Sequence, residues 1–221
     1  MTIKVNGFLI YPEALDRAEQ DALVRDLRTV MAVAPLYRPA MPRTGQPYSA
    51  LMTNCGPLGW VSDRAGYRYQ DRHPETGQRW PDIPDRLLAL WNRYAEGSQA
   101  PEAALITFYT ETAKLGLHVD STEEDRTAPV LSVSLGDTAV FRMGGLRRTD
   151  ATRSVKLTSG TVVVMGGAAR LAYHGVDRIL GGSSRLFGEG GRLSVTLRRV
   201  TRRPEGPVAS SGPGAPTGPR D

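Results

Sequence analysis

Cysteine and long apolar stretches are scarce in this chain of 221 residues. Cys55 is the only cysteine, which excludes an intramolecular disulfide and a cysteine-based zinc site and predicts a reducing compartment, the cytoplasm. No stretch approaches the roughly 18 uninterrupted apolar residues that a membrane span needs. The first residues also lack the basic and then apolar pattern of a secretory signal. We therefore expect a cytoplasmic protein without membrane contact.

Lysine is also rare: there are three lysines, so arginine supplies 25 of the 28 basic residues, and the formal net charge is +5. Guanidinium groups form paired hydrogen bonds to phosphates and carboxylates, which suits a nucleic acid or an acidic substrate as partner. An arginine bias inherited from gene composition explains the same count. Charge alone leaves both interpretations open.

The length suits one globular unit with a single sizeable core. Residues 204–221 contain five prolines, four glycines and one valine, too little apolar surface to fold. We predict a folded domain over residues 1–203 and a disordered tail over 204–221.

Two segments show helical periodicity. A helix is predicted to begin near Pro12, and a second helix near Pro84. Their apolar faces consist of Leu15, Ala18, Ala22, Leu23, Leu27, Val30 and Met31 in the first, and Leu87, Leu88, Trp91 and Tyr94 in the second. Residues 34–86 are rich in Pro, Gly, Tyr and Arg without a sustained period, which predicts irregular loops or short strands outside the core.

From Ala104 onward, short segments alternate apolar and polar residues or form short apolar runs between glycines. These predicted strands are ALITFYT (104–110), VLSVSLG (130–136), TAVFRM (138–143), SVKLTSG (154–160), TVVVMGG (161–167) and RLSVTLRRV (192–200). Their number and spacing predict an antiparallel sandwich or barrel-like roll with the helices outside it. The fold class is α+β, mainly β.

Two of the three histidines, His118 and His174, lie in this β region. In an extended segment His118 and Asp120 point to the same side, and His174 can add a third ligand from another strand. Two histidines and one carboxylate on one face of an octahedral ion are the ligand set of non-haem Fe(II) oxygenases. Because His-x-Asp also arises by chance, a hydrogen-bonded pair at a strand end is the alternative.

The last predicted strand carries a polar face of Arg192, Ser194, Thr196 and Arg198. If this face points inward, two buried cations require anionic partners, and a small dicarboxylate would satisfy them. The alternative is an edge strand with a solvated face. Thr107 and Tyr109 share a face of their own strand, either as hydroxyl donors to the same anion or as ordinary polar strand residues.

Together these motifs resemble the AlkB family of Fe(II)- and 2-oxoglutarate-dependent dioxygenases. The resemblance covers about residues 1–200. Over this span, several segments look like segments of the bacterial AlkB demethylases and follow one another in the same order. They are TNCGPLGW (53–60), GYRY (66–69), KLGLHVD (114–120), PVLSVSLG (129–136), FRMGGLRR (141–148) and YHGV (173–176). The resemblance implies a double-stranded β-helix (jelly-roll) core with N-terminal helices and a nucleotide-recognition lid at about residues 34–86.

The resemblance also implies roles for individual residues. The iron ligands are His118, Asp120 and His174. The 2-oxoglutarate site contains Arg192, Arg198 and Tyr109, together with Thr107 and Ser194, which stand where the best-known bacterial form has asparagine.

Substrate contacts are implied for Trp60 and Tyr67 of the lid and for Arg148, with the flipped base stacked between Trp60 and His118. A core aromatic is the alternative interpretation of Trp60. Thr122 stands where an acidic residue usually helps to read the base, and Met165 stands where the best-known form has tryptophan. Glu123 and Glu124 follow Thr122 without a reason to point inward.

The implied activity is oxidative demethylation of N-alkylated bases of the 1-methyladenine and 3-methylcytosine type in DNA, and also in RNA, as direct-reversal repair. It consumes 2-oxoglutarate and O2, requires Fe(II) and releases formaldehyde. The target base must be single-stranded or flipped out of the duplex, and we expect a monomer. The alternatives are the same chemistry on tRNA or other modified RNA, and a non-catalytic nucleic-acid-binding β-domain.

Overall fold

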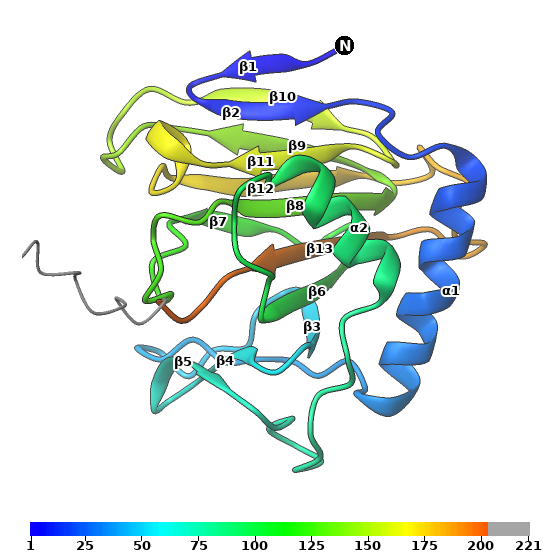
Figure 1. Ribbon diagram of the computed structural model, residues 1–221, viewed down its shortest axis with the longest axis vertical. Helices are drawn as coiled ribbons and strands as arrows, with labels where there is room; N and C mark the ends of the chain where they lie inside the picture. The colour runs from blue at the N-terminus through cyan, green and yellow to red at the C-terminus, as the bar shows by residue number, and fades with distance from the viewer. Residues whose placement is uncertain (203–221) are drawn as a thin grey trace, which may run out of the picture.

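The structure is a computed structural model, and it describes residues 1–202 (Figure 1). Two antiparallel sheets face each other, and two helices cover the outer face of the larger sheet. The sandwich predicted from the strand pattern is therefore confirmed. The tail predicted over 204–221 lies outside the described residues.

The larger sheet has seven strands in the order β1-β2-β11-β8-β13-β6-β3. The strand bounds are β1 Ile3–Val5, β2 Phe8–Tyr11, β3 Leu51–Cys55, β6 Ala103–Tyr109, β8 Val130–Gly136, β11 Val162–Met165 and β13 Arg192–Arg198. β13, the strand with the predicted polar face, lies between β8 and β6 in the middle of the sheet. The edge-strand interpretation of this segment is therefore wrong.

The smaller sheet has four strands in the order β10-β9-β12-β7, and a separate hairpin is formed by β4 and β5. Their bounds are β7 Leu115–His118, β9 Thr138–Met143, β10 Arg153–Leu157, β12 His174–Leu180, β4 Gly59–Asp63 and β5 Gly66–Gln70. The β4–β5 hairpin lies at one end of the sandwich, beside β3 (Figure 1).

Helix α1 spans Arg17–Val33, and α2 spans Asp85–Tyr94. The prediction for α2 is confirmed, whereas the predicted start of α1 near Pro12 is wrong. Asp16 is the N-cap: its carboxylate accepts the Glu19 backbone N–H, and the Glu19 carboxylate accepts the Asp16 N–H. This capping box satisfies amides that the first turn leaves free, and so it sets where the helix begins. Neither helix is long and apolar enough to cross a membrane.

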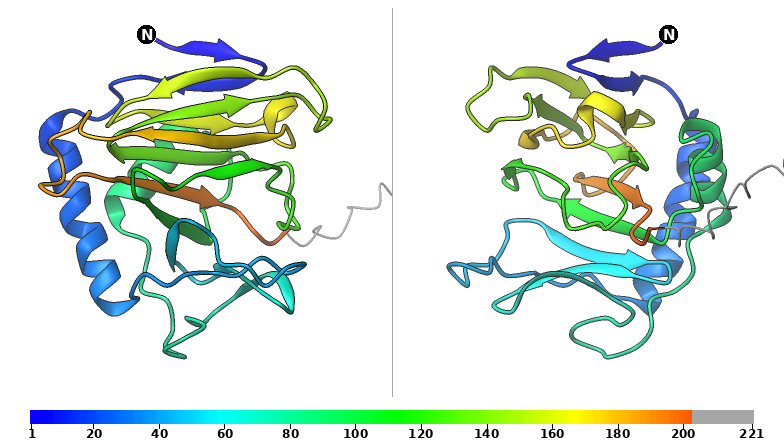
Figure 2. Two further views of the ribbon diagram at one scale, coloured as in Figure 1. Left: turned by 180° about the vertical axis from the view of Figure 1, so that it is seen from behind. Right: turned by 60° about the vertical axis from the view of Figure 1, so that its left-hand side comes forward.

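The alternation along each strand divides the apolar core into two layers. On β13, Leu193, Val195 and Leu197 face the helices and join the cluster that contains Leu27 of α1 and Trp91 of α2. Figure 2 shows both helices on this one side of the sandwich. The second cluster fills the space between the sheets, with Phe8, Ile10, Val163, Met165, Phe141 and Val176 among its members. The polar residues of β13 therefore face the space between the sheets.

The expectation that residues 34–86 stay outside the core is wrong for β3. Met52 and Cys55 of this strand are buried, and β3 pairs with β6 over its whole length. Thr53 and Asn54 are polar but buried, so the sequence of β3 lacks the apolar pattern expected of a core strand. Their side chains are satisfied by backbone atoms of Ala34 and Trp60.

We predict that Leu27→Ala lowers the free energy of unfolding by about 2 to 5 kcal/mol, because it leaves a cavity between α1 and the larger sheet. Leu27 is fully buried, whereas Leu146, the matched control, is 66% exposed. Urea denaturation of both variants measures the difference. Equal stabilities of L27A and L146A would contradict this account of the outer core layer.

A candidate metal centre between the two sheets

A cavity of about 440 Å³ lies between the two sheets and extends to the β4–β5 hairpin. Its walls contain every residue that the sequence singled out for a site: Trp60, Tyr67, Thr107, Tyr109, His118, Asp120, Thr122, Arg148, His174, Arg192, Ser194 and Arg198. The fold thus brings these residues to one place, although their individual roles stay predictions.

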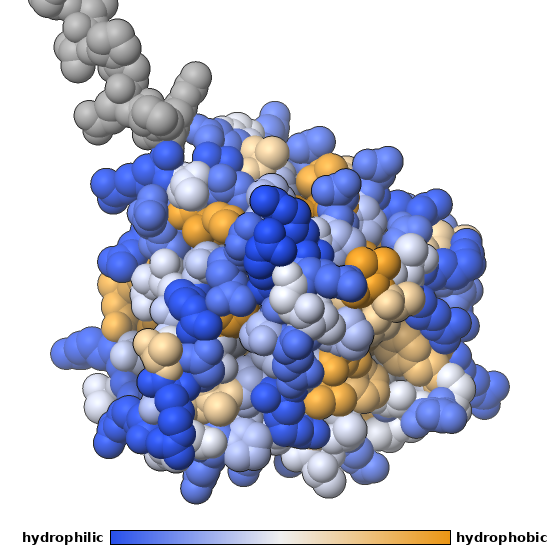
Figure 3. Space-filling view, turned by 90° about the horizontal axis from the view of Figure 1, so that it is seen from below, coloured by the Kyte–Doolittle hydropathy of each residue, from blue (hydrophilic) through white to orange (hydrophobic). Residues whose placement is uncertain are grey.

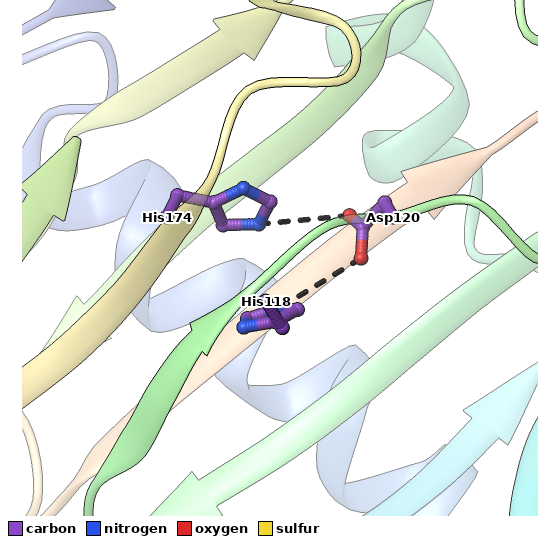
Figure 4. A group of neighbouring side chains, drawn as sticks. All are labelled: His118, Asp120 and His174. Carbon is purple, nitrogen blue, oxygen red and sulfur yellow. Dashed lines mark ion pairs between the residues drawn. The ribbon is translucent and has the colours of Figure 1, made fainter. Parts of the chain in front are cut away.

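His118, Asp120 and His174 face one another inside this cavity (Figure 4). Asp120 Oδ1 lies 3.8 Å from His118 Nε2, and Oδ2 lies 3.8 Å from His174 Nε2. One ligand atom from each side chain can be chosen so that all three lie within 4.8 Å of one another. The pairing of β7 with β12 places the histidines opposite each other, and Asp120 follows two residues after His118. The geometry fits a two-histidine, one-carboxylate metal site.

Both imidazoles are oriented by backbone carbonyls. His118 Nδ1 lies 2.9 Å from the Gly116 oxygen, and His174 Nδ1 lies 3.0 Å from the Ala172 oxygen. Because a carbonyl only accepts hydrogen bonds, Nδ1 carries the proton in each ring. Nε2 is then the unprotonated nitrogen that can bind a metal, and it is Nε2 that points toward Asp120.

Electrostatics and burial keep Asp120 and His174 in their metal-binding forms. Burial alone would raise the pKa of the Asp120 carboxyl, but Arg198 and the two histidines hold it below its ordinary value. Arg198 Nη2 donates to Asp120 Oδ2 over 2.9 Å. Burial lowers the pKa of His174 to about 4, so its imidazole is neutral at pH 7. A charged carboxylate and neutral imidazoles are the forms that bind a metal ion.

The guanidinium of Arg192 provides the second feature of the cavity. Arg192 is 1% exposed, its Nη2 donates to Ser134 Oγ over 3.0 Å, and its carbon lies 5.3 Å from the centre of the Tyr109 ring. Within residues 1–202, Nε and Nη1 of both Arg192 and Arg198 are buried donors without a hydrogen-bond partner, although Arg198 Nε lies 3.2 Å from a Glu123 carboxylate oxygen as an ion pair. Buried unpaired cationic donors are costly, so this end of the cavity is suited to an anion.

Hydroxyl groups line the same end of the cavity. The register sets Ser194 of β13 opposite Thr107 of β6, and Arg192 opposite Tyr109. Ser194 Oγ lies 3.1 Å from Ser132 Oγ of β8. Thr107, Tyr109 and Ser194 are buried and line the cavity together with Arg192, so hydroxyl groups are available there as neutral hydrogen-bond donors.

Two aromatic residues of the β4–β5 hairpin also line the cavity. Trp60 of β4 is half-buried, and it stacks on Tyr67 of β5 with ring centres 5.7 Å apart and an angle of 19°. Tyr67 is 53% exposed. Trp60 also packs against the inner core layer, so it combines a core contact with a wall of the cavity. Figure 3 shows this end of the molecule as hydrophilic side chains interspersed with separate hydrophobic groups.

Three further positions lie around the cavity. Thr122 is exposed at the rim, and Met165 is buried in the inner core layer. Arg148 is exposed; its Nη1 donates to the Leu117 carbonyl over 2.8 Å, and its guanidinium lies over the Tyr173 ring.

Sequence reasoning missed Glu123, which is 2% exposed and lines the cavity. Its carboxylate accepts hydrogen bonds from Tyr69 and Arg170. The sequence marks it only as an acidic residue directly after Thr122, and its inward orientation could not be predicted because its partners come from distant segments.

Comparison with known proteins gives a consistent result. The sequence profile of the 2OG-Fe(II) oxygenase superfamily matches residues 7–198. The alpha-ketoglutarate-dependent dioxygenase AlkB homolog of Caulobacter vibrioides (strain NA1000 / CB15N) is 52% identical over 198 residues, which are 89% of each chain. The nucleic acid dioxygenase ALKBH1 of Mus musculus is 36% identical over 129 residues, 56% of this chain and 32% of that protein. The solved structure of OsALKBH1 superposes with a TM-score of 0.73 at 29% identity, covering 89% of this chain and all of the other.

We predict that Asp120→Asn lowers the affinity for Fe(II) by more than about 100-fold, because loss of a direct ligand should exceed the 10- to 100-fold typical of outer partners. The substitution removes the negative charge and leaves Arg198 with a weaker partner. Anaerobic Fe(II) titration measures the effect, and the exposed Glu124→Gln is the matched control. Uptake of Fe(II) by D120N with unchanged affinity would refute the metal site.

Proposed function

Since this chain belongs to the AlkB family of the 2OG-Fe(II) oxygenase superfamily, we propose that it oxidatively demethylates N-alkylated bases of DNA. The chain is an Fe(II)- and 2-oxoglutarate-dependent dioxygenase with a jelly-roll core. Lesions of the 1-methyladenine and 3-methylcytosine type are the proposed substrates. A cytoplasmic location and a monomeric state stay predictions.

One observation carries the proposal: the candidate metal ligands, the buried guanidinium donors and two aromatic side chains of the hairpin line a single cavity. His118, Asp120 and His174 would hold Fe(II), and the unpaired donors of Arg192 fit the carboxylate of 2-oxoglutarate. When bound, Fe(II) with 2-oxoglutarate and O2 supplies the oxidising chemistry, which decarboxylates 2-oxoglutarate to succinate and releases the methyl group as formaldehyde.

The protein's own contribution is charge placement and exclusion of water. Arg192 presents two charged donors, Nε and Nη1, that have no partner within residues 1–202, which suits the oxygens of a carboxylate. Arg198 keeps Asp120 ionised. The apolar residues of the inner core layer surround these charges, so the interactions act in a medium of low polarity.

The aromatic side chains of the β4–β5 hairpin suit contact with a nucleic-acid base. A base inside a duplex cannot reach the metal ligands, so it must be flipped out or come from a single strand. Stacking on an aromatic ring contributes about 1 to 3 kcal/mol per base, and Trp60 and Tyr67 offer such rings beside the cavity. The mouse relative is called a nucleic acid dioxygenase, and this supports a nucleic acid as the class of substrate.

Basic residues around the β9–β10 connection are candidates for phosphate contacts. Two arginines there already have acidic partners, since Arg147 pairs with Asp150 and Arg142 pairs with Asp177. The remaining basic residues, which form no ion pair within the described part of the chain, are Arg148, Arg153 and Lys156. These three are the better candidates for a contact that weakens as salt is added.

The decisive experiment is mass spectrometry of a methylated DNA oligonucleotide incubated with the protein, Fe(II), ascorbate and 2-oxoglutarate. We expect replacement of one methyl group by hydrogen and one formaldehyde per base repaired. The D120N variant is the inactive control. Demethylation of tRNA but not of DNA would support the RNA alternative, and no turnover of either would refute the proposal.

We predict that Arg192→Lys raises the KM for 2-oxoglutarate by about 10- to 100-fold, because an ammonium group cannot form the paired hydrogen bonds of a guanidinium. Steady-state kinetics with varied 2-oxoglutarate measures the effect. Arg178→Lys is the matched control, since Arg178 is exposed on β12 and lines no part of the cavity. The assignment of Arg192 fails if R192K and R178K have the same KM.

A further inference from the structure

Glu123 is a buried carboxylate that the mechanism above does not use. Its Oε1 accepts a hydrogen bond from the Tyr69 hydroxyl over 2.5 Å and lies 3.2 Å from Arg198 Nε. Its Oε2 accepts from Arg170 Nη2 over 3.2 Å. Each oxygen therefore accepts one hydrogen bond, and Oε1 also forms an ion pair with Arg198 Nε that lacks hydrogen-bond geometry.

The three partners of Glu123 belong to different parts of the molecule. Tyr69 lies on β5 of the hairpin, whereas Arg198 ends β13 and also holds Asp120. Arg170 follows the short 3-10 helix Gly167–Ala169, and its Nη1 donates to the Asp120 backbone carbonyl over 2.6 Å. The Glu123 carboxylate thus connects the hairpin with Asp120 in two ways. Arg198 contacts the Asp120 side chain, and Arg170 contacts its backbone carbonyl.

Burial makes these connections strong and specific. Arg170 and Arg198 are 4% and 6% exposed, and buried charges persist only where they are paired. Burial raises the pKa of the Tyr69 hydroxyl well above its ordinary value, so this group remains a donor at neutral pH. The hydrogen bond from Tyr69 is short, and hydrogen bonds to ionised groups strengthen one another along a buried network.

We propose that Glu123 is a positioning residue that couples the β4–β5 hairpin to the co-substrate end of the cavity. When Tyr69 donates to Oε1, the carboxylate is held in the orientation that also fixes Arg198. An anion that binds the fixed arginine then stabilises the docked hairpin, and the docked hairpin favours the anion by the same factor. The inference rests on the proposed function for the position of 2-oxoglutarate near Arg192 and Arg198.

A purely structural ion pair is the competing explanation, and it makes a different prediction. A structural pair affects the stability of the whole domain, whereas a coupling residue changes how the hairpin responds to 2-oxoglutarate. Tyr69→Phe separates the two, because it removes one hydroxyl on the hairpin and leaves Glu123, Arg170 and Arg198 unchanged.

The test measures binding and local protection in the full chain. Calorimetry gives the Kd of 2-oxoglutarate for the anaerobic Fe(II) protein, and amide hydrogen exchange follows β4 and β5 with and without 2-oxoglutarate. In the wild type and in the Glu124→Gln control, we expect 2-oxoglutarate to slow exchange in the hairpin. In Tyr69→Phe and Glu123→Gln, we expect this slowing to disappear and the Kd to rise at least about fivefold.

Tyr69→Phe decides the matter if Glu123→Gln fails to fold. The inference is overturned if Y69F keeps both the wild-type Kd and the slowed exchange, or if the wild-type hairpin does not respond to 2-oxoglutarate. Neither measurement uses a nucleic acid. Failure to demethylate an oligonucleotide would therefore count against the proposed function and leave this result standing, and the reverse also holds.

Discussion

The structure depends on the compensation of charges between two sheets, and Asp120 is at its centre. This carboxylate lies 2.9 Å from Arg198 and 3.8 Å from each of two imidazoles. A sandwich interior is otherwise apolar, so each buried charge needs a partner of opposite sign. Arg198 provides that partner in the protein itself, whereas Arg192 forms no ion pair within residues 1–202 and keeps Nε and Nη1 without a hydrogen-bond partner. Arg198 therefore maintains the charge of Asp120, and both arginines retain buried donors for an anion.

The sheet architecture makes this arrangement compatible with a stable fold. Strands β6, β8, β11 and β13 each have one face toward the helices and one toward the cavity. The same segment can therefore contribute to the apolar core and to the site. On β13, three apolar side chains join the outer core layer, and the intervening arginines and hydroxyls point to the ligand side. The β4–β5 hairpin is tied to this frame through Tyr69 and Glu123, which places aromatic side chains near the metal ligands.

Much of the site could be predicted because its residues obey the two-residue period of a strand. Alternation placed Arg192 and Arg198 on one face, and the His-x-Asp spacing placed His118 and Asp120 on one side. The starting point of α1 and the burial of β3 were predicted wrongly. The first depends on a capping box formed by Asp16 and Glu19, and the second on buried polar side chains whose partners lie in other segments. Pro12 suggested an earlier helix start, and the polar residues of segment 34–86 suggested a solvent-exposed loop or strand.

By itself, the sequence determined the α+β class, the strand periodicity and the set of side chains able to bind a metal ion and an acid. Local patterns suffice for these properties, because a strand's period depends only on its own residues. Tertiary structure decided which polar face is buried, since this requires β13 to lie between β8 and β6. It also decided that Glu123 points inward, because only the folded chain brings Tyr69, Arg170 and Arg198 around one carboxylate.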